Sequence, residues 1–170
     1  MKIFCWKTPE KACSEHVYSL LKTAVKRVYG IDSPDVFKTE SGKPYFKNSN
    51  IHFSLSHSGN YALCVLDSFP IGADIQIIRS ISPSLPYAVC TLEELEKMDF
   101  FTLWTLKESY IKLYGKKSMD YKDMTFSKKG GKILCFDEKI FCSTFDIIPG
   151  YALSVCAMSE VPACPITFID

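Results

Sequence analysis

Hydrophobic and polar positions in the first part of the chain predict a strand, a helix and then further short strands. The run at 2–6 is apolar and rich in β-forming residues, so it predicts a strand. Residues 14–29 place apolar side chains at helical spacing, with Ser14 as the expected N-cap and Gly30 as the C-terminal stop. Short extended pieces around a Ser-Gly-Lys-Pro turn at 41–44 are predicted over 36–58, and a strand is predicted at 61–66.

The second part is predicted to begin with a strand at 71–78, after a Ser-Phe-Pro link. A Ser/Pro-rich loop at 80–86 precedes a short helix over 91–98 and a longer helix over about 101–115. The remainder alternates in the manner of strands, with Lys-Gly-Gly at 129–131 as the expected hairpin turn. These predicted strands lie at 124–126, 132–136, 139–147 and 151–158.

The two parts resemble each other. The stretch 21–30 aligns with 106–115, and both stretches end in Tyr-Gly. Further similarities occur in the same order, between the runs at 2–6 and 71–78 and between those at 59–66 and 150–157. Three similarities in one order favour an internal duplication over chance. The counterpart of Glu108 in the first copy is Thr23, which has no carboxylate. We therefore expect the chemistry in the second copy and a single active site.

This order of elements predicts an α+β fold, a pseudo-dimer of two similar halves, each a helix packed on a small antiparallel sheet. We place the N-terminal half at 1–69 and the C-terminal half at 70–170. Because the duplicated halves are already fused in one chain, we expect a monomer.

Composition limits the class of protein. The chain has 170 residues, of which 47% are hydrophobic and 23% charged, so it can bury a substantial core. Its net charge of +1 indicates neither nucleic acid nor a membrane surface as a partner. We find no signal pattern and no apolar run near the ~20 residues that span a bilayer, and we therefore expect a cytoplasmic protein.

The eight cysteines could suggest disulfides or a metal site, but their spacing supports neither. No pair has the C-x-x-C spacing, and the three histidines are not grouped with them. Cys5, Cys64 and Cys156 lie within apolar strand-like runs, where a free thiol behaves as a small hydrophobic group. We therefore predict reduced cysteines in the core.

Two carboxylates stand out as candidates for chemistry. On the helix at 101–115, Glu108 lies at the boundary of a polar half that also carries Thr105, Ser109 and Lys112. Glu108 and Lys112 could equally be an ordinary exposed i,i+4 pair. Asp74 lies in an apolar strand run, where an unpaired charge is costly, so it should have a partner or serve as a structural hydrogen-bonding group.

Four motifs in order resemble the Sfp-like group of the 4′-phosphopantetheinyl transferases. They are Gly-Lys-Pro at 42–44, Phe-Ser-Leu-Ser-His-Ser at 53–58, Gly-Ala-Asp-Ile-Gln at 72–76, and Trp-Thr-Leu-Lys-Glu-Ser at 104–109 followed by Lys112. One such motif would be weak, whereas four in the family's order are specific. The resemblance covers roughly residues 40 to 157 and also implies a pseudo-dimeric fold.

The resemblance implies that coenzyme A is the co-substrate, with Mg²⁺ on its pyrophosphate and an acyl or peptidyl carrier protein as the acceptor. It implies that Asp74 and Glu108 ligate Mg²⁺, that Glu108 helps to deprotonate the acceptor serine, and that Lys112 stabilises the departing 3′,5′-ADP. The residues that it assigns to coenzyme A are Lys43, Pro44, Ser56, His57 and Lys112. Glu94 matches a recurrent acid of the family, and its role stays open.

The chain departs from the family at several positions. Gln76 replaces the second acid of the Asp-x-Glu strand motif, so it offers the metal an uncharged carbonyl oxygen. Ser54 replaces the usual asparagine, and the segment before the first helix is shorter. These departures support one alternative, a relative that binds coenzyme A or a carrier protein without turnover. A further alternative is an unrelated α+β binding domain in which the motifs are coincidental. A Ser56–His57 hydrolase is disfavoured, because adjacent residues in a strand point to opposite faces.

Overall fold

The first half of the chain forms a strand, a long helix and two hairpins. A computed structural model describes residues 1–115, 120–162 and 165–169. The elements of this half are β1 (Lys2–Lys7), α1 (Ser14–Tyr29), β2 (Val36–Lys38), β3 (Pro44–Phe46), β4 (His52–Ser58) and β5 (Tyr61–Asp67). The first predicted helix is confirmed, and Gly30 ends it in the left-handed conformation. Its N-cap is Cys13, not Ser14.

The second half begins with β6 (Ile71–Ile77), which is followed, within the described residues, by helices and then strands. The helices are α2 (Leu85–Val89), α3 (Leu92–Lys97) and α4 (Phe100–Tyr114). The strands are β7 (Phe126–Lys129), β8 (Lys132–Cys135), β9 (Phe141–Thr144), β10 (Tyr151–Ala157) and β11 (Ile166–Ile169). The hairpin turn between β7 and β8 is confirmed, since Gly130 and Gly131 both have positive φ. Sequence patterning missed α2 and β11.

The predicted duplication is visible in the strand order. In the first sheet the order is β11-β1-β5-β4, and in the second it is β6-β10-β9-β8-β7. The opening strand of each half therefore pairs antiparallel with the strand that ends the repeat, β1 with β5 and β6 with β10. The helices α1 and α4 both end in a left-handed glycine, Gly30 and Gly115. The α+β pseudo-dimer is confirmed, whereas the boundary at 69/70 stays a prediction.

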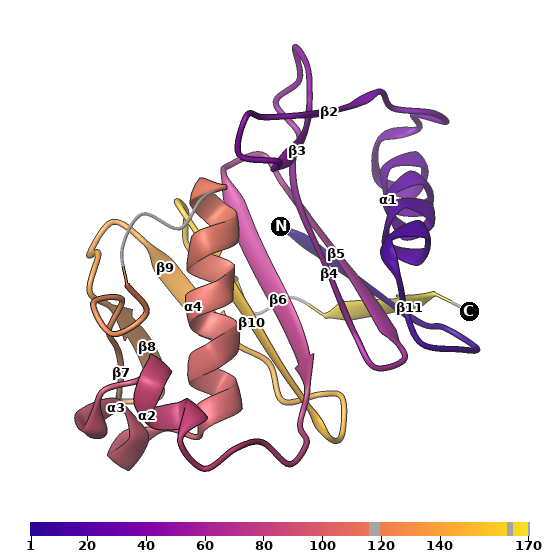
Figure 1. The fold of residues 1–170 in the computed structure, drawn as a ribbon. Coiled ribbons are helices and arrows are strands. Elements are labelled where there is room, and N and C mark those ends of the chain that lie inside the picture. Colours follow the sequence, from indigo (N-terminus) through magenta and orange to yellow (C-terminus); the bar gives the residue numbers. More distant parts are fainter. Residues whose placement is uncertain (116–119, 163–164, 170) are drawn as a thin grey trace.

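The two larger sheets lie between the two long helices, and β2 and β3 form a separate two-stranded sheet (Figure 1). One core cluster joins the sheets face to face, with side chains such as Ile3 and Leu63 from the first and Ile75 and Val155 from the second. A second cluster packs α1 on the outer face of its sheet, and a third packs α4 on the other. The result is a four-layer arrangement in which the halves share their central core.

A row of serines connects the edges of the two sheets. Alternate residues of β4 are serines, and their hydroxyls accept hydrogen bonds from alternate N–H groups of β6. The pairs are Ser54 with Ala73 at 2.9 Å, Ser56 with Ile75 at 3.4 Å and Ser58 with Ile77 at 3.0 Å. These hydroxyls satisfy backbone donors that β6 would otherwise expose at its edge. They also bring residues of the first half beside those of the second.

The cysteines agree with the prediction of free thiols. Cys5, Cys64, Cys90, Cys142 and Cys156 are free and buried. Cys135 is half-buried and Cys13 is exposed at the start of α1, so these two are not core residues. Cys164 lies outside the described residues. Across the described parts of the chain, no helix has the length and apolar character needed to cross a membrane.

Candidate active site

The site lies where α4 packs closely on β6. A side chain at Gly72 would collide with the Ser109 carbonyl oxygen and the Leu113 amide, so glycine permits this approach. Asp74 lies two residues further along the same face of β6 and is directed towards α4. The contact also carries hydroxyl groups, since Ser109 donates to the Ser154 carbonyl at 2.9 Å and Thr105 Oγ1 lies 2.7 Å from Ser154 Oγ.

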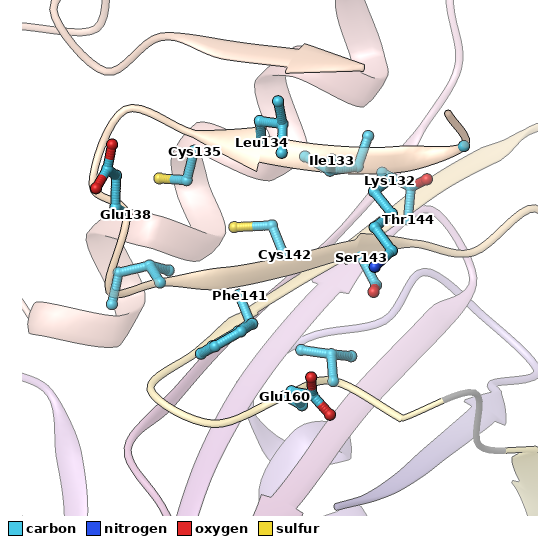
Figure 2. Close-up of a pocket in the computed structure, with 13 residues that line it drawn as sticks. Lys132, Ile133, Leu134, Cys135, Glu138, Phe141, Cys142, Ser143, Thr144 and Glu160 are labelled. Atoms are coloured by element: carbon cyan, nitrogen blue, oxygen red, sulfur yellow. The ribbon is translucent and has the colours of Figure 1, made fainter. Parts of the chain in front are cut away.

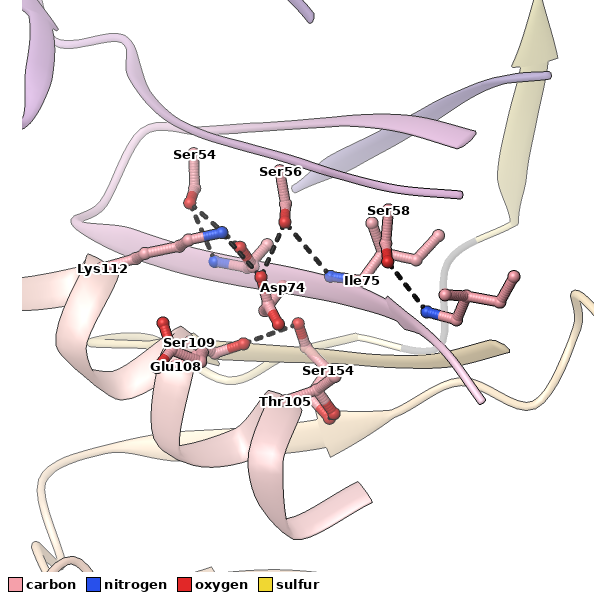
Figure 3. Close-up of polar contacts among 12 residues, drawn as sticks. Ser54, Ser56, Ser58, Asp74, Ile75, Thr105, Glu108, Ser109, Lys112 and Ser154 are labelled. Atoms are coloured by element: carbon pink, nitrogen blue, oxygen red, sulfur yellow. Dashed lines mark hydrogen bonds and ion pairs between the residues drawn. The ribbon is translucent and has the colours of Figure 1, made fainter. Parts of the chain in front are cut away.

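Asp74 is buried, with 6% of its surface exposed, and it has the partners that its position requires. Lys112 Nζ lies 2.7 Å from Oδ1 of Asp74, and the Ser56 hydroxyl donates to the same oxygen at 2.6 Å (Figure 3). Lys112 comes from α4 and Ser56 from β4. One carboxylate oxygen therefore connects the two halves.

Glu108 lies on α4 one turn before Lys112 and is half-buried. Its Oε1 accepts a hydrogen bond of 2.5 Å from the hydroxyl of Tyr121. Burial, followed by the hydrogen bond and the charge of Glu108 and the charge of Asp74, raises the pKa of Tyr121 above its usual value. Both carboxylates therefore act on the same phenol. The Glu108–Lys112 ion pair considered from sequence does not occur, because Lys112 pairs with Asp74.

Lys107, beside Glu108, is completely buried and forms a network that sequence analysis missed. Its amine contacts both carboxylate oxygens of Glu94, at 2.9 and 3.0 Å. It also donates to the backbone oxygens of Tyr121 and Met124, each at 2.8 Å. Glu94 additionally accepts the Phe126 N–H and the Thr91 N–H, the latter within the capping box of α3. Glu94, whose role was open, thus neutralises the lysine that precedes Glu108.

A cavity of about 230 Å³ lies beside this cluster, between the turn before β3 and the C-terminal end of α4. Lys43, Pro44 and Lys112, three of the residues predicted to bind coenzyme A, line it. The amine of Lys43 donates to the Leu113 carbonyl at 2.5 Å. Burial lowers the pKa of Lys43 to about 8, because the charged amine has lost much of its hydration. The first half therefore contributes a cation to the end of α4.

The other predicted residues lie around this cluster with different surroundings. Ser56 is buried against Asp74, whereas His57 points to the opposite side and is exposed, as expected for neighbours in a strand. The part of the imidazole that is shielded from water, together with the nearby charge of Lys112, lowers the pKa of His57, although Asp74 opposes the shift. Gln76 is half-buried, and its amide donates to the Ile77 carbonyl at 3.4 Å. It shares the face of β6 that carries Asp74.

The donor set fits a hard cation that is held partly by its substrate. Asp74 and Glu108 offer carboxylate oxygens, and Gln76 offers an amide oxygen on the same strand face as Asp74. Within the described residues, no group of three or more His, Cys, Asp or Glu side chains could hold a metal ion. Mg²⁺ commonly needs only one or two protein carboxylates when phosphate oxygens and water complete its shell. The residues therefore fit Mg²⁺ together with a phosphate ligand.

A larger cavity, of about 700 Å³, lies over β8 and β9 and the segment at 160–161 (Figure 2). Cys135, Cys142 and Phe141 are among its lining residues. None of the catalytic, coenzyme A-binding or metal-binding residues predicted from the sequence lines this cavity. Cavity size alone would therefore direct attention away from the polar cluster between the halves.

The fold and the site define a duplicated α+β protein with a polar cluster of two carboxylates and a lysine where its halves meet. No family model matches the chain. The 4′-phosphopantetheinyl transferase Sfp of Bacillus subtilis (strain 168) is 31% identical over 157 residues, which cover 81% of this chain and 70% of the relative. The 4′-phosphopantetheinyl transferase psf-1 of Bacillus pumilus is 29% identical over 85% of this chain and 70% of its own.

A shorter similarity extends to 4′-phosphopantetheinyl transferase HetI of Nostoc sp. (strain PCC 7120 / SAG 25.82 / UTEX 2576), which is 33% identical over 56% of this chain and 48% of the relative. The identity and coverage shared with the Bacillus subtilis protein show the family. The chain belongs to the Sfp-type 4′-phosphopantetheinyl transferases.

Proposed function

We propose that this protein transfers the 4′-phosphopantetheine group of coenzyme A to a serine hydroxyl of an acyl or peptidyl carrier protein and releases 3′,5′-ADP. The observation that carries the proposal is the ion pair of Asp74 with Lys112, one helical turn from Glu108, beside a cavity lined by Lys43 and Pro44. Lys43 and Lys112 line this cavity, and Asp74 lies next to Lys112, so a pyrophosphate bound there would meet two cations beside the acids. Family membership supports the same reaction.

Coenzyme A is bound, in this proposal, along the junction of the halves. Lys43 and Lys112 supply positive charge to its phosphates, and Pro44 supplies an apolar wall of the same cavity. His57 lies exposed on the strand that carries Ser56 and can donate to a phosphate oxygen. Ser56 acts mainly through Asp74, whose Oδ1 it holds.

Asp74 and Glu108 would hold Mg²⁺, with the amide oxygen of Gln76 as a weaker third ligand. When bound, the ion would neutralise charge on the pyrophosphate. Gln76 carries no charge, so the protein contributes two negative charges to this set. Asp74 is already fixed by Lys112 and Ser56, and it need not be reoriented as the substrate binds.

The transfer needs a base and a stabilised leaving group. Glu108 accepts the proton of the carrier serine, directly or through one water, as the serine oxygen attacks the phosphorus that bears the pantetheine arm. The bond from that phosphorus to the bridging oxygen breaks, and its electron pair leaves with 3′,5′-ADP. Lys112 stabilises the negative charge that develops on this leaving group.

The direct test is to incubate the protein with coenzyme A, Mg²⁺ and several apo carrier proteins of the acyl and peptidyl types, and then to measure the mass of each carrier. We expect one carrier type to gain one phosphopantetheine group, with 3′,5′-ADP released in equal amount. Absence of any mass gain on all carriers would reject the transferase.

Gln76 favours a second candidate, a relative that binds coenzyme A or a carrier protein without turnover, because the metal set has lost one acid. Calorimetry separates the two candidates. A binder would bind coenzyme A or the carrier and leave the carrier mass unchanged. We further propose that the protein acts as a cytoplasmic monomer with neither nucleic acid nor a membrane as a partner, which sedimentation and cell fractionation would test.

A further inference from the structure

Tyr121, in the segment between α4 and β7, contacts α4 in three separate ways. Its ring stacks on Trp104, with 5.7 Å between centroids and 13° between planes. Its backbone oxygen accepts the amine of Lys107 at 2.8 Å. Its hydroxyl donates to Oε1 of Glu108 at 2.5 Å. The three helix positions lie on adjacent turns, so Tyr121 is fixed at its backbone, its ring and its hydroxyl.

The hydrogen bond from Lys107 to the backbone oxygen of Tyr121 belongs to a buried network. Lys107 has no exposed surface, and its charge is neutralised by Glu94, which is itself 3% exposed. Glu94 is held in turn by the N–H of Phe126, the first residue of β7. The segment that carries Tyr121 is therefore tied to α3, α4 and β7 together. Such a network places the phenol more firmly than an exposed hydrogen bond would.

The hydroxyl contact determines which oxygen of Glu108 is available. A glutamate on a helix surface has three rotatable bonds and loses rotamer entropy when it is fixed. Tyr121 takes Oε1 and thereby orients the carboxylate, whose other oxygen, Oε2, has no hydrogen-bond partner among the described residues. Oε1 of an ionised carboxylate can only accept, so the Tyr121 hydroxyl is the donor of this hydrogen bond.

We propose that Tyr121 is a positioning residue that holds Oε1 of Glu108 and so presents Oε2 to the metal and the acceptor serine; this rests on the proposed function. The arrangement parallels that at Asp74, whose Oδ1 is held by Ser56 and Lys112. Both carboxylates of the site thus have one oxygen fixed by the protein. Because Gln76 is uncharged, metal binding in this proposal depends on the orientation of the Asp74 and Glu108 carboxylates.

The test compares Tyr121→Phe with Tyr114→Phe. The first variant keeps the ring that stacks on Trp104 and removes only the hydroxyl. The second removes a phenol hydroxyl of α4 that donates to a different carboxylate, Asp137, at 3.1 Å. Two quantities are measured, the kcat and KM of transfer, and the dissociation constant of Mg²⁺ from the protein saturated with coenzyme A, by calorimetry.

For Tyr121→Phe we expect Mg²⁺ binding to weaken by about tenfold and kcat to fall by about tenfold, as is typical when a group that orients a metal ligand is removed. The KM for the carrier should change by less than about twofold, since the carrier surface is untouched. Tyr114→Phe should match the wild type. In the Glu108→Gln background, Tyr121→Phe should cause no further loss of Mg²⁺ affinity, because it acts through Glu108.

Wild-type Mg²⁺ affinity in Tyr121→Phe would overturn the inference. The inference would also be overturned if Tyr121→Phe lowered Mg²⁺ affinity equally in the wild type and in the Glu108→Gln variant. A wild-type complex that binds no Mg²⁺ would also overturn it. If the wild type binds Mg²⁺ but modifies no carrier, the proposed function fails, and the Mg²⁺ measurements still decide the role of Tyr121.

Discussion

The two halves place different side chains on equivalent positions of the same scaffold. Strand β5 corresponds to β10, so that Cys64 corresponds to Ser154. The strand register then makes Phe4, which faces Cys64, the counterpart of Asp74, which faces Ser154. On the helices, Thr23 and Ala24 correspond to Glu108 and Ser109. At these buried positions the contact between helix and sheet is apolar in the first half. In the second half it carries the carboxylate of Asp74 and the hydroxyls of Ser109 and Ser154.

This difference shows where burial of polar groups is tolerated. In the first half, α1 packs through residues such as Leu20, Leu21 and Val25, and Thr23 only bonds back to the Ser19 carbonyl. In the second half, each buried polar group has a partner from another segment, as Lys107 has Glu94 and Asp74 has Ser56. The polar contact is therefore stable only because distant parts of the chain complete it.

The sheet edges differ in the same way. The outer edge of β1 pairs with the parallel strand β11, through Phe4 with Thr167 among others. The outer edge of β6 meets the serine side chains of β4 instead. A backbone strand at that edge would leave no hydroxyl beside Asp74. The side-chain connection thus supplies Ser56 to the site.

The largest expected effect comes from removing the carboxylate that only the second half carries. Glu108→Gln should lower the rate of carrier modification by about 10²–10⁴-fold, because the amide cannot accept the serine proton. The matched change in the first half, Thr23→Val, should leave the rate unchanged. Initial rates measured by carrier mass, with circular dichroism to monitor the fold, would check both. Full activity in Glu108→Gln would remove Glu108 from the site.

The second prediction compares two aligned lysines. Lys107→Met should reduce the free energy of unfolding by about 3–5 kcal/mol, because it leaves Glu94 charged and buried without its partner. Lys22→Met, at the corresponding exposed position of α1, should change it by less than about 0.5 kcal/mol. Urea unfolding monitored by fluorescence measures both. Similar losses of unfolding free energy in the two variants would mean that the buried Lys107–Glu94 ion pair adds no stability beyond that of an exposed lysine.

Local patterns predicted much of this molecule, because they report backbone propensity and amphipathicity. The bounds of α1, the ends of both long helices at Gly30 and Gly115, and most strands follow from periodicity and glycine placement. Strand β11 was missed because its partner, β1, lies at the other end of the chain. The short helix α2 lies in a Ser/Pro-rich stretch without helical periodicity.

The site was predictable in its charged residues and not in the groups that fix them. Asp74 was noted because a charge in an apolar strand needs a partner, and Lys112 and Ser56 are those partners. The helical wheel placed Thr105 and Ser109 on a polar half, yet both are buried against β10. Lys107 was part of a motif but was assigned no role, and Tyr121 was not singled out, because the significance of both depends on contacts that no local pattern contains.

The smallest effect concerns the lysine that the first half contributes to the second. Lys43 has a pKa lowered to about 8, so its amine is charged below pH 8 and loses its proton as the pH rises above that value. A bound phosphate would stabilise the charged form and raise this pKa again. Affinity for coenzyme A should therefore fall by about tenfold as the pH rises through 8, and it should level off at the pKa of the complex. Calorimetry between pH 7 and 10 would measure this fall.

Lys43→Arg should remove that pH dependence, because a guanidinium keeps its charge throughout the range. Lys26→Arg is the matched control, since Lys26 lies in the last turn of α1 and pairs with Asp32 in solvent at 2.5 Å. It should retain the wild-type fall in affinity. If Lys43→Arg still loses affinity above pH 8, another group responds to the pH, and Lys43 serves only the carbonyl end of α4. If the fall disappears, the first half takes part in the site through its charge as well as its serines.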